Sequence, residues 1–237
     1  MAEVYAGTSG WSYSSWKPKF YPAKLASAKF LSYYATRLNS VEVNYTFRTL
    51  PTEKLLTGWI ASTPANFKFT VKAHQMITHI KRLRGAEDHM SRFLHSLQVL
   101  RDEGRLGLIL FQLPPNFKCD VARLIEFLGH VPDEIRCAFE FRHESWFCEE
   151  VYAALRARNV ALCWAESEEL KTPEIRTADF SYLRLRKERY PAAAIELVIS
   201  KVKKLAQHGD VFAYFKHEET PEGAVCAEQV LRRFRAQ

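Results

Sequence analysis

Eight short apolar segments, each ending in polar residues, constrain the fold of this chain more than any other feature. They cover residues 4–8, 40–44, 67–73, 106–113, a run that starts at Ala138, and residues 160–164, 180–185 and 211–216. Helical patterns cover residues 26–38, a segment that opens at Pro51, and residues 87–101, 121–129, 149–158, 192–207 and 224–235, whereas the sixth apolar segment is followed by little helical pattern. Eight strands alternating with helices in 237 residues, about 30 residues for each unit, predict an α/β fold of the (β/α)₈ TIM-barrel type.

The turn after the first strand bears on the main alternative, a doubly wound open sheet. Such a sheet ordinarily carries a glycine-rich phosphate-binding turn at this point. Residues 7–11 read GTSGW, which matches neither G-x-G-x-x-G nor the P-loop. No linker or low-complexity segment interrupts the chain, so we expect residues 1–237 to form a single domain.

Polar and charged side chains recur on one face of the strands, near the carboxyl ends. Because side chains alternate between the faces of a strand, Glu140 and Arg142 share one face and Phe139 and Phe141 share the other. The same alternation directs a further apolar set toward the helices, namely Val41, Val43, Leu183, Leu185, Ala213 and Phe215. The polar set is expected at the carboxyl end of the barrel, where TIM barrels have their sites. It comprises Thr8, Glu42, Asn44, Lys72, Gln112, Glu140, Arg142, Glu166, Tyr182, Arg184, Arg186, Tyr214 and Lys216.

The charges of this polar set do not balance. Five cations stand against three carboxylates, and five minus three leaves two positive charges; the cations are Lys72, Arg142, Arg184, Arg186 and Lys216, and the carboxylates are Glu42, Glu140 and Glu166. A structural plug of paired Glu and Arg does not need that excess, whereas a site for phosphate or carboxylate does, since Arg presents a planar fork to such groups. We therefore expect an anionic small molecule in the barrel mouth.

Glu140 is the candidate general acid or base of such a site. Residues two apart on a strand lie about 6.5–7 Å apart, so we expect Arg142 to hold the Glu140 carboxylate in a buried ion pair. His143, His217 and Glu166 are further candidates for proton transfer. An enzyme and a binding protein both fit this pattern.

Two other kinds of site compete with this interpretation. Glu140, His143, Glu166, His217 and Glu218 could bind a divalent metal, as in a metal-dependent hydrolase or isomerase. No H-E-x-x-H pair occurs and cations are interspersed, so we predict no metal ligands and identify no cofactor. A Ser/His/Asp triad lacks the G-x-S-x-G nucleophile elbow.

A nucleic-acid-binding protein is the alternative outside small-molecule chemistry. The net charge is +7 and the isoelectric point is about 9.1, which favours contact with anions but also fits a solvated basic surface. Trp11, Tyr13 and Trp16 in the first loop could form a rim on which bases or sugars stack. They could equally well plug the barrel mouth.

The cysteines and the apolar segments bear on the compartment. Five cysteines form no C-x-x-C pair, which is typical of a reducing compartment. The first residues show no basic stretch followed by an apolar one, and no apolar run approaches the ~18 residues of a membrane helix. We therefore expect a cytoplasmic protein that does not enter a membrane, and the sequence leaves the oligomeric state open.

Several motifs together resemble a known family. They are GTSGWSY at residues 7–13 with Trp16 and residues 20–22 (FYP), VEVN at 41–44 with Thr46 and Phe47, Thr63-Pro64 with Phe67, ITH at 77–79, QLPP at 112–115, and EFRH at 140–143 with Ser145 and Trp146. They resemble the family catalogued as domain of unknown function 72, the YecE-like proteins, over nearly the whole chain. The resemblance implies a TIM-type barrel of soluble, mostly bacterial or archaeal proteins, and it implies no particular reaction.

The chain departs from the commonest pattern of that family at three strand ends. Residues Ala165-Glu166 stand where the family often has an Asp, Arg186-Lys187 where it has His-Gly, and His217-Glu218 where it has Asn-Asp. All three departures fall at the expected site, so its ligand is expected to differ from that of relatives.

Overall fold

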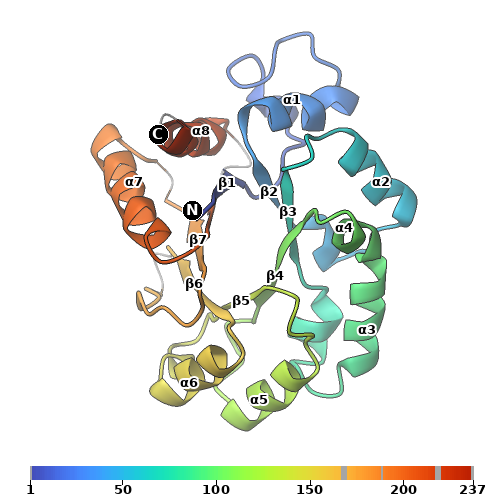
Figure 1. The fold of residues 1–237 in the computed structure, drawn as a ribbon, viewed down its shortest axis with the longest axis vertical. Helices are drawn as coiled ribbons and strands as arrows, with labels where there is room; N and C mark the ends of the chain where they lie inside the picture. Colours follow the sequence, from blue (N-terminus) through green and yellow to red (C-terminus); the bar gives the residue numbers. More distant parts are fainter. Residues whose placement is uncertain (1, 167–169, 188, 217–219, 236–237) are drawn as a thin grey trace.

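The structure, a computed structural model, describes residues 2–166, 170–187, 189–216 and 220–235. Eight parallel strands stand side by side in the order β1-β8-β7-β6-β5-β4-β3-β2 and form a nearly closed barrel ringed by helices (Figure 1). The strands are β1 (Val4–Thr8), β2 (Ser40–Val43), β3 (Lys68–Lys72), β4 (Leu106–Gln112), β5 (Cys137–Glu140), β6 (Ala161–Ala165), β7 (Ser181–Leu185) and β8 (Val211–Phe215). The predicted (β/α)₈ barrel is confirmed.

Side chains close the seam between β1 and β2. One backbone bridge joins the two strands, between Ser9 and Glu42. Further down the seam, the Tyr34 hydroxyl accepts from the Thr8 amide at 2.9 Å and donates to the Ser40 carbonyl at 3.0 Å. Gly7 lies so close to β2 that a Cβ there would stand 1.9 Å from the Ser40 carbonyl oxygen. The barrel therefore closes only because this position has no side chain.

The helices follow the predicted positions with small shifts. They are α1 (Phe30–Arg37), α2 (Glu53–Ala61), α3 (Glu87–Ser96), α4 (Gln98–Asp102), α5 (Val121–Gly129), α6 (Glu149–Ala157), α7 (Ala192–Ala206) and α8 (Glu222–Arg235). The side chains of Thr52 and Asp120 accept from the backbone amides of Leu55 and Arg123, so each caps the start of a helix. The single helix predicted for residues 87–101 is divided at Leu97 into α3 and α4, and the predicted loop after β3 contains a π-helix (Met76–Ile80). None of the described helices is long and apolar enough to cross a membrane.

The connection between β6 and β7 differs from the other connections of the barrel. Its described residues, 166 and 170–180, contain no helix, as the sequence pattern indicated. In Figure 1 this connection is a loop between α6 and α7, on the outer side of β6 and β7. Part of the outer face of these two strands is thus covered by extended chain rather than by a helix.

Two separate apolar clusters confirm the predicted alternation of side chains. The outer cluster, between strands and helices, contains all eight side chains that were predicted to face the helices, from Val41 to Phe215. The inner cluster fills the barrel below its mouth and consists of Leu108, Leu110, Ala138, Ala161, Cys163, Phe180, Tyr182, Phe212 and Tyr214. Above this inner layer, at the carboxyl ends of the strands, the barrel interior becomes charged.

Candidate functional site

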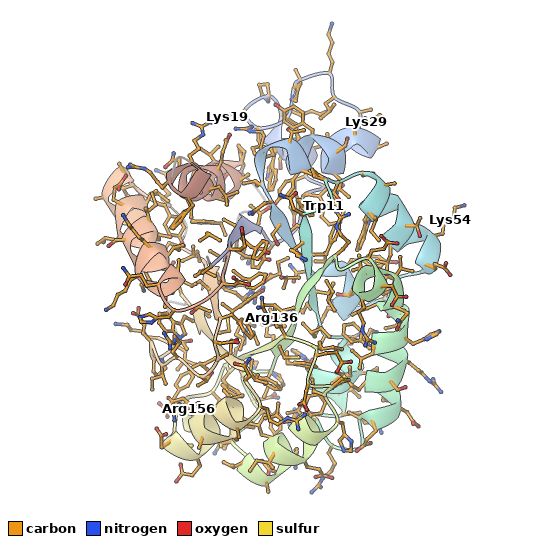
Figure 2. The ribbon with its side chains drawn as sticks, in the orientation of Figure 1. Trp11, Lys19, Lys29, Lys54, Arg136 and Arg156 are labelled. Atoms are coloured by element: carbon orange, nitrogen blue, oxygen red, sulfur yellow. The ribbon has the colours of Figure 1, made fainter. Side chains whose placement is uncertain are left out.

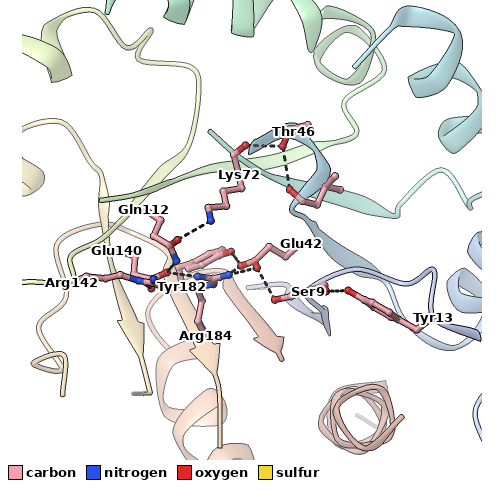
Figure 3. Close-up of polar contacts among 11 residues, drawn as sticks. Ser9, Tyr13, Glu42, Thr46, Lys72, Gln112, Glu140, Arg142, Tyr182 and Arg184 are labelled. Carbon is pink, nitrogen blue, oxygen red and sulfur yellow. Dashed lines mark hydrogen bonds and ion pairs between the residues drawn. The ribbon is translucent and has the colours of Figure 1, made fainter. Parts of the chain in front are cut away.

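Arg184 lies at the centre of the barrel mouth and binds two carboxylates. From the end of β7 its Nε and Nη2 donate to the two oxygens of Glu42 at 2.8 and 2.6 Å, and its Nη1 donates to Glu140 Oε2 (Figure 3). The side chains of Arg184, Glu42 and Glu140 are at most 4% exposed. Three strands thus contribute one buried charged cluster.

Glu42 has two further partners. Ser9 Oγ donates to Glu42 Oε1 at 2.7 Å, and the Tyr182 hydroxyl donates to Glu42 Oε2. Tyr13 in turn donates to the Ser9 carbonyl at 2.9 Å, so the first loop is attached to this carboxylate through Ser9. Glu42 accepts four hydrogen bonds in all and is fixed in position.

Glu140 connects the cluster to the other side of the mouth. Gln112 Nε2 donates to Glu140 Oε2 at 2.9 Å, and Lys72 Nζ donates to Gln112 Oε1 at 2.7 Å (Figure 3). Arg142 Nε donates to Glu140 Oε1 at 3.1 Å, but the Arg142 side chain is 41% exposed. The expected Glu140–Arg142 ion pair therefore forms, whereas the expectation that it is buried is wrong; the buried partner of Glu140 is Arg184.

The ion pairs hold both carboxylates in the charged form. Burial by itself would raise the pKa of Glu42 and of Glu140, but Arg184, Arg186 and the neighbouring hydrogen-bond donors together outweigh burial and hold the pKa of each carboxyl below its usual value. Burial would lower the pKa of Arg184, and the two carboxylates raise it well above the usual value instead. All three groups are ionised at neutral pH, and this favours a hydrogen-bond-accepting or electrostatic role for Glu140 over proton donation.

Lys72 and His79 form the weakly basic side of the mouth. Burial, reinforced by Arg184, lowers the pKa of Lys72 to about 8. Its Nζ lies 4.0 Å from the ring centre of Phe47, whose other neighbour is the His79 ring at 4.9 Å. Burial, together with Lys72 and Arg142, lowers the pKa of His79 to about 4, so that imidazole is neutral at pH 7.

A cavity of about 340 Å³ opens beside the cluster at the carboxyl end of the barrel. Arg186 is its distinguishing residue: the Nε atom is buried without a hydrogen-bond partner, and the guanidinium forms no ion pair with any described residue. Glu166 cannot easily compensate it, since its carboxylate accepts from the Tyr190 hydroxyl at 2.5 Å and pairs with Lys187 at 3.6 Å. The described charged residues that line the cavity are Glu140, Arg142, Glu166, Arg186 and Lys216.

Three predicted ligand-binding residues are structural instead. Thr8 lies on the outward-facing side of β1, where its Oγ1 bonds to the Tyr34 hydroxyl and the Gly10 carbonyl, so Ser9 takes its expected place in the mouth. Trp16 is completely buried among the aromatic residues of the first loop and cannot stack on a ligand. Tyr214 is buried below the mouth, where it bonds to Ser40 and Thr70.

Other predicted residues occupy the edge of the site. The half-buried Trp11 packs edge-on against Trp59, and Tyr13 packs on Trp16. Asn44 is half-buried at the end of β2. His143 Nδ1 accepts from the Ser145 amide at 3.2 Å and caps the short helix Glu144–Trp146 rather than lining the cavity. His217 and Glu218 lie outside the described residues.

The metal alternative gains no support from the described part of the chain. No group of three His, Cys, Asp or Glu side chains among those residues is arranged to hold a metal ion. The alternative also relied on His217 and Glu218, which the structure does not describe.

The sequence pattern missed Ser9, His79, Phe47 and Tyr190. Ser9 could have been found by extending the alternation of β1 by one residue, since Tyr5, Gly7 and Ser9 share a face. Phe47 belongs to one of the family motifs, but strand alternation connects neither Phe47 nor Tyr190 to the mouth. His79 lies on the π-helix, a feature often found at functional sites.

The parallel barrel and its charged carboxyl-terminal mouth define a protein of the TIM-barrel class. A family model described as "Protein of unknown function DUF72" matches residues 5–237, and the chain belongs to this family. The resemblance stated from the sequence motifs is thereby confirmed.

Individual relatives agree with this assignment. The chain is 31% identical to UPF0759 protein YunF of Bacillus subtilis over 69% of this chain and 59% of that protein, and 30% identical to UPF0759 protein YecE of Escherichia coli K12 over 62% and 51%. These matches thus span little more than half the length of either relative. A DUF72 family protein from Thermotoga maritima shares 28% identity at a TM-score of 0.87, over 98% of this chain and 99% of that one. One from Enterococcus faecalis shares the fold at 18% identity and a TM-score of 0.82.

Proposed function

We propose that the barrel mouth binds a small molecule bearing a phosphate or carboxylate group. The observation that carries this proposal is Arg186, a mostly buried guanidinium that lines the cavity and has no counterion among the described residues. Placing a charge in such a position is costly unless it is used, because burial removes its hydration. Burial and the neighbouring Arg184 both disfavour the charged form of Arg186 and lower its pKa. A bound anion would stabilise the charged form and so offset both effects.

The surrounding charges support an anion over a cation. Glu42, Glu140 and Arg184 with Arg142 sum to zero, two carboxylates against two guanidinium groups, and Glu166 is already paired with Lys187. Arg186 and Lys216 then face the cavity as cations without an ion-pair partner among the described residues, and Lys72 adds a third positive group across the mouth. An arginine fork next to a lysine is a common receptor for phosphate.

The acid/base role predicted for Glu140 stays a prediction. Its low pKa favours a fixed carboxylate that orients a bound molecule through hydrogen bonds. The burial of Trp16 also removes one of the three side chains of the aromatic rim on which the nucleic-acid alternative depended.

A thermal-shift series at constant ionic strength tests the proposal. Phosphate at about 100 times its dissociation constant should raise the melting temperature by roughly 5–10 °C, since that excess contributes about 2.7 kcal/mol. Arg186→Ala should lose the shift, whereas Arg156→Ala, a matched change of an exposed arginine on α6, should keep it. Equal shifts in all three proteins would indicate a general salt effect and contradict the proposal.

Adding an oligonucleotide in the same experiment distinguishes the nucleic-acid alternative from a site for a small anion. If a short single-stranded oligonucleotide stabilises the protein, with a steep loss on adding salt, while phosphate and carboxylates have no effect, the site recognises nucleic acid instead.

A further inference from the structure

A second cavity lies on the outer side of β6 and β7. It has a volume of about 460 Å³ and exists where the connection after β6 lacks a helix in its described residues. Its apolar side is the half-buried Trp164 ring, behind which lie the outward-facing and buried Leu183 and Leu185. The segment around Thr172 forms a wall, held in place by a 3.0 Å hydrogen bond from Trp164 Nε1 to the Ile175 carbonyl.

This outer cavity and the mouth cavity are adjoining. Four residues, Ala165, Glu166, Thr172 and Arg186, line both of them. Arg186 is the charged group at the boundary, and its buried Nε lacks a partner. The two cavities are therefore neighbours, with Arg186 at their common boundary.

The described residues on the rim of the outer cavity carry an excess of positive charge. Among them, four cations, Lys171, Arg186, Lys187 and Lys201, stand with two carboxylates, Glu166 and Glu174, and four minus two leaves two positive charges. Lys201 is paired with Glu174 and Lys187 with Glu166, so the two excess charges belong to Lys171 and Arg186. Both the polar rim and the apolar side of the cavity are thus adjacent to the proposed anion site.

We propose that the ligand spans both cavities, with its anionic group at Arg186 and an apolar or aromatic portion against the Trp164 ring. This inference rests on the proposed function and names the class of ligand more closely: a phosphate or carboxylate joined to an apolar group, rather than a wholly hydroxylated compound such as a sugar phosphate. A sugar phosphate would satisfy Arg186 but would leave the apolar side of the outer cavity without a partner. An apolar group bound there would be removed from water, and this strengthens binding.

Calorimetric titration of the purified protein with two probes tests the inference. The probes are inorganic phosphate and 1-naphthyl phosphate, with glucose 6-phosphate as a hydroxylated control of similar charge. Wild-type protein is expected to bind 1-naphthyl phosphate at least tenfold more tightly than either of the other two. If it binds all three equally, the two-cavity inference is wrong while the proposed function stands; if it binds none of them, the proposed function is wrong as well.

Two variants test where each part of the ligand binds. Thr172→Phe places a ring in the wall shared by the cavities, so the tenfold preference for 1-naphthyl phosphate should disappear while phosphate affinity is kept. Arg186→Ala should weaken the binding of inorganic phosphate and of 1-naphthyl phosphate. A Thr172→Phe protein that folds and keeps the full preference would show that the aromatic group binds elsewhere and would overturn the inference. The wild-type comparison decides the matter without any variant if Thr172→Phe does not fold.

Discussion

The guanidinium of Arg184 contacts two ionised carboxylates, and its removal would leave both of them buried without a counterion. Breaking a buried pair in this way costs about 3–5 kcal/mol, whereas an exposed pair contributes below about 1 kcal/mol. We therefore expect Arg184→Met to lower the free energy of unfolding by at least about 3 kcal/mol, and Arg142→Ala by less than about 1 kcal/mol. Urea denaturation of both variants measures the two values. A larger loss for Arg142→Ala than for Arg184→Met would mean that the cluster is assigned to the wrong arginine.

Lys72 offers a second test at the scale of a single residue. Burial and the neighbouring Arg184 lower its pKa to about 8, so its amine becomes a nucleophile at lower pH than an ordinary lysine does. Acetylation at limiting reagent, followed by peptide mass spectrometry across pH 6–11, should give a profile at Lys72 with a midpoint near 8. Arg184→Met should move that midpoint upward, because a repelling cation is lost. A midpoint near 10.5 in the wild-type protein, the usual lysine value, would contradict the electrostatic description of the mouth.

Single residues also show how much of the site could be predicted from the sequence. Alternation along the strands correctly placed Glu42, Glu140, Arg184 and Lys72 at one end of the barrel, because period two is a local property of a strand. The same argument could not identify the buried partner of Glu140, since Arg184 is 44 positions away along the chain and approaches only through the closed barrel. The burial of Trp16 depends likewise on how the first loop packs on α1, a contact without a local pattern.

At the scale of elements, the closure of β1 on β2 depends on Gly7. An alanine Cβ at this position would stand 1.9 Å from the Ser40 carbonyl oxygen, so the two strands would have to separate. Overpacking of this kind typically costs about 1–3 kcal/mol, and we expect Gly7→Ala to lie at the upper end of that range. Gly58→Ala on α2 is the matched control: nothing lies within 4 Å of its Cβ position, and alanine in an exposed helix is favoured by roughly 0.5–1 kcal/mol. Thermal or urea denaturation should therefore give effects of opposite sign, and a neutral Gly7→Ala would contradict the tight seam.

The sequence predicts the presence of each strand and helix better than it predicts where a helix divides or changes type. All eight strands follow from apolar runs, and helices that begin close to Pro51 and Val121 follow from the helical patterns. The division of α3 from α4 at Leu97 and the π-helix at Met76–Ile80 were not predicted. Neither segment contains Gly or Pro, so no local residue marks the division or the π-helix.

At the scale of the whole molecule, the mouth should make stability depend on acidity. The pKa values of Glu42 and Glu140 lie below the ordinary 4.5 in the folded protein, so the folded state releases these two protons more readily than the unfolded state. Their contribution is therefore fully present above about pH 4.5 and is lost as the pH falls below it.

A neutral variant isolates that contribution from the other carboxylates. Glu42→Gln/Glu140→Gln/Arg184→Met replaces the buried cluster by uncharged groups of similar size. The free energy of unfolding should fall less steeply between pH 5 and pH 3 in this variant than in the wild-type protein. Parallel curves for the two proteins would mean that the cluster does not titrate as described.

The most direct test of the central claim, an anion site at the carboxyl-terminal mouth, is the position of a bound anion in a crystal. The molecule contains its own reference site, because a third cavity of about 440 Å³ at the amino-terminal end of the barrel is also lined by cations, namely Lys68, Arg101 and Arg136. There, however, Arg136 is paired with Asp210 at 2.6 Å and Arg101 with Glu134 at 3.1 Å. In Figure 2, Arg136 lies near the middle of the barrel, whereas Lys19, Lys29, Lys54 and Arg156 point outward around its edge.

Tungstate, a tetrahedral dianion with a strong anomalous signal, should be soaked into crystals of the protein at low ionic strength. We expect an anomalous peak within hydrogen-bonding distance of Arg186 in the mouth cavity, and no peak there in Arg186→Ala crystals. A peak only at the amino-terminal cavity or at the outer lysines, with the mouth empty, would contradict this expectation.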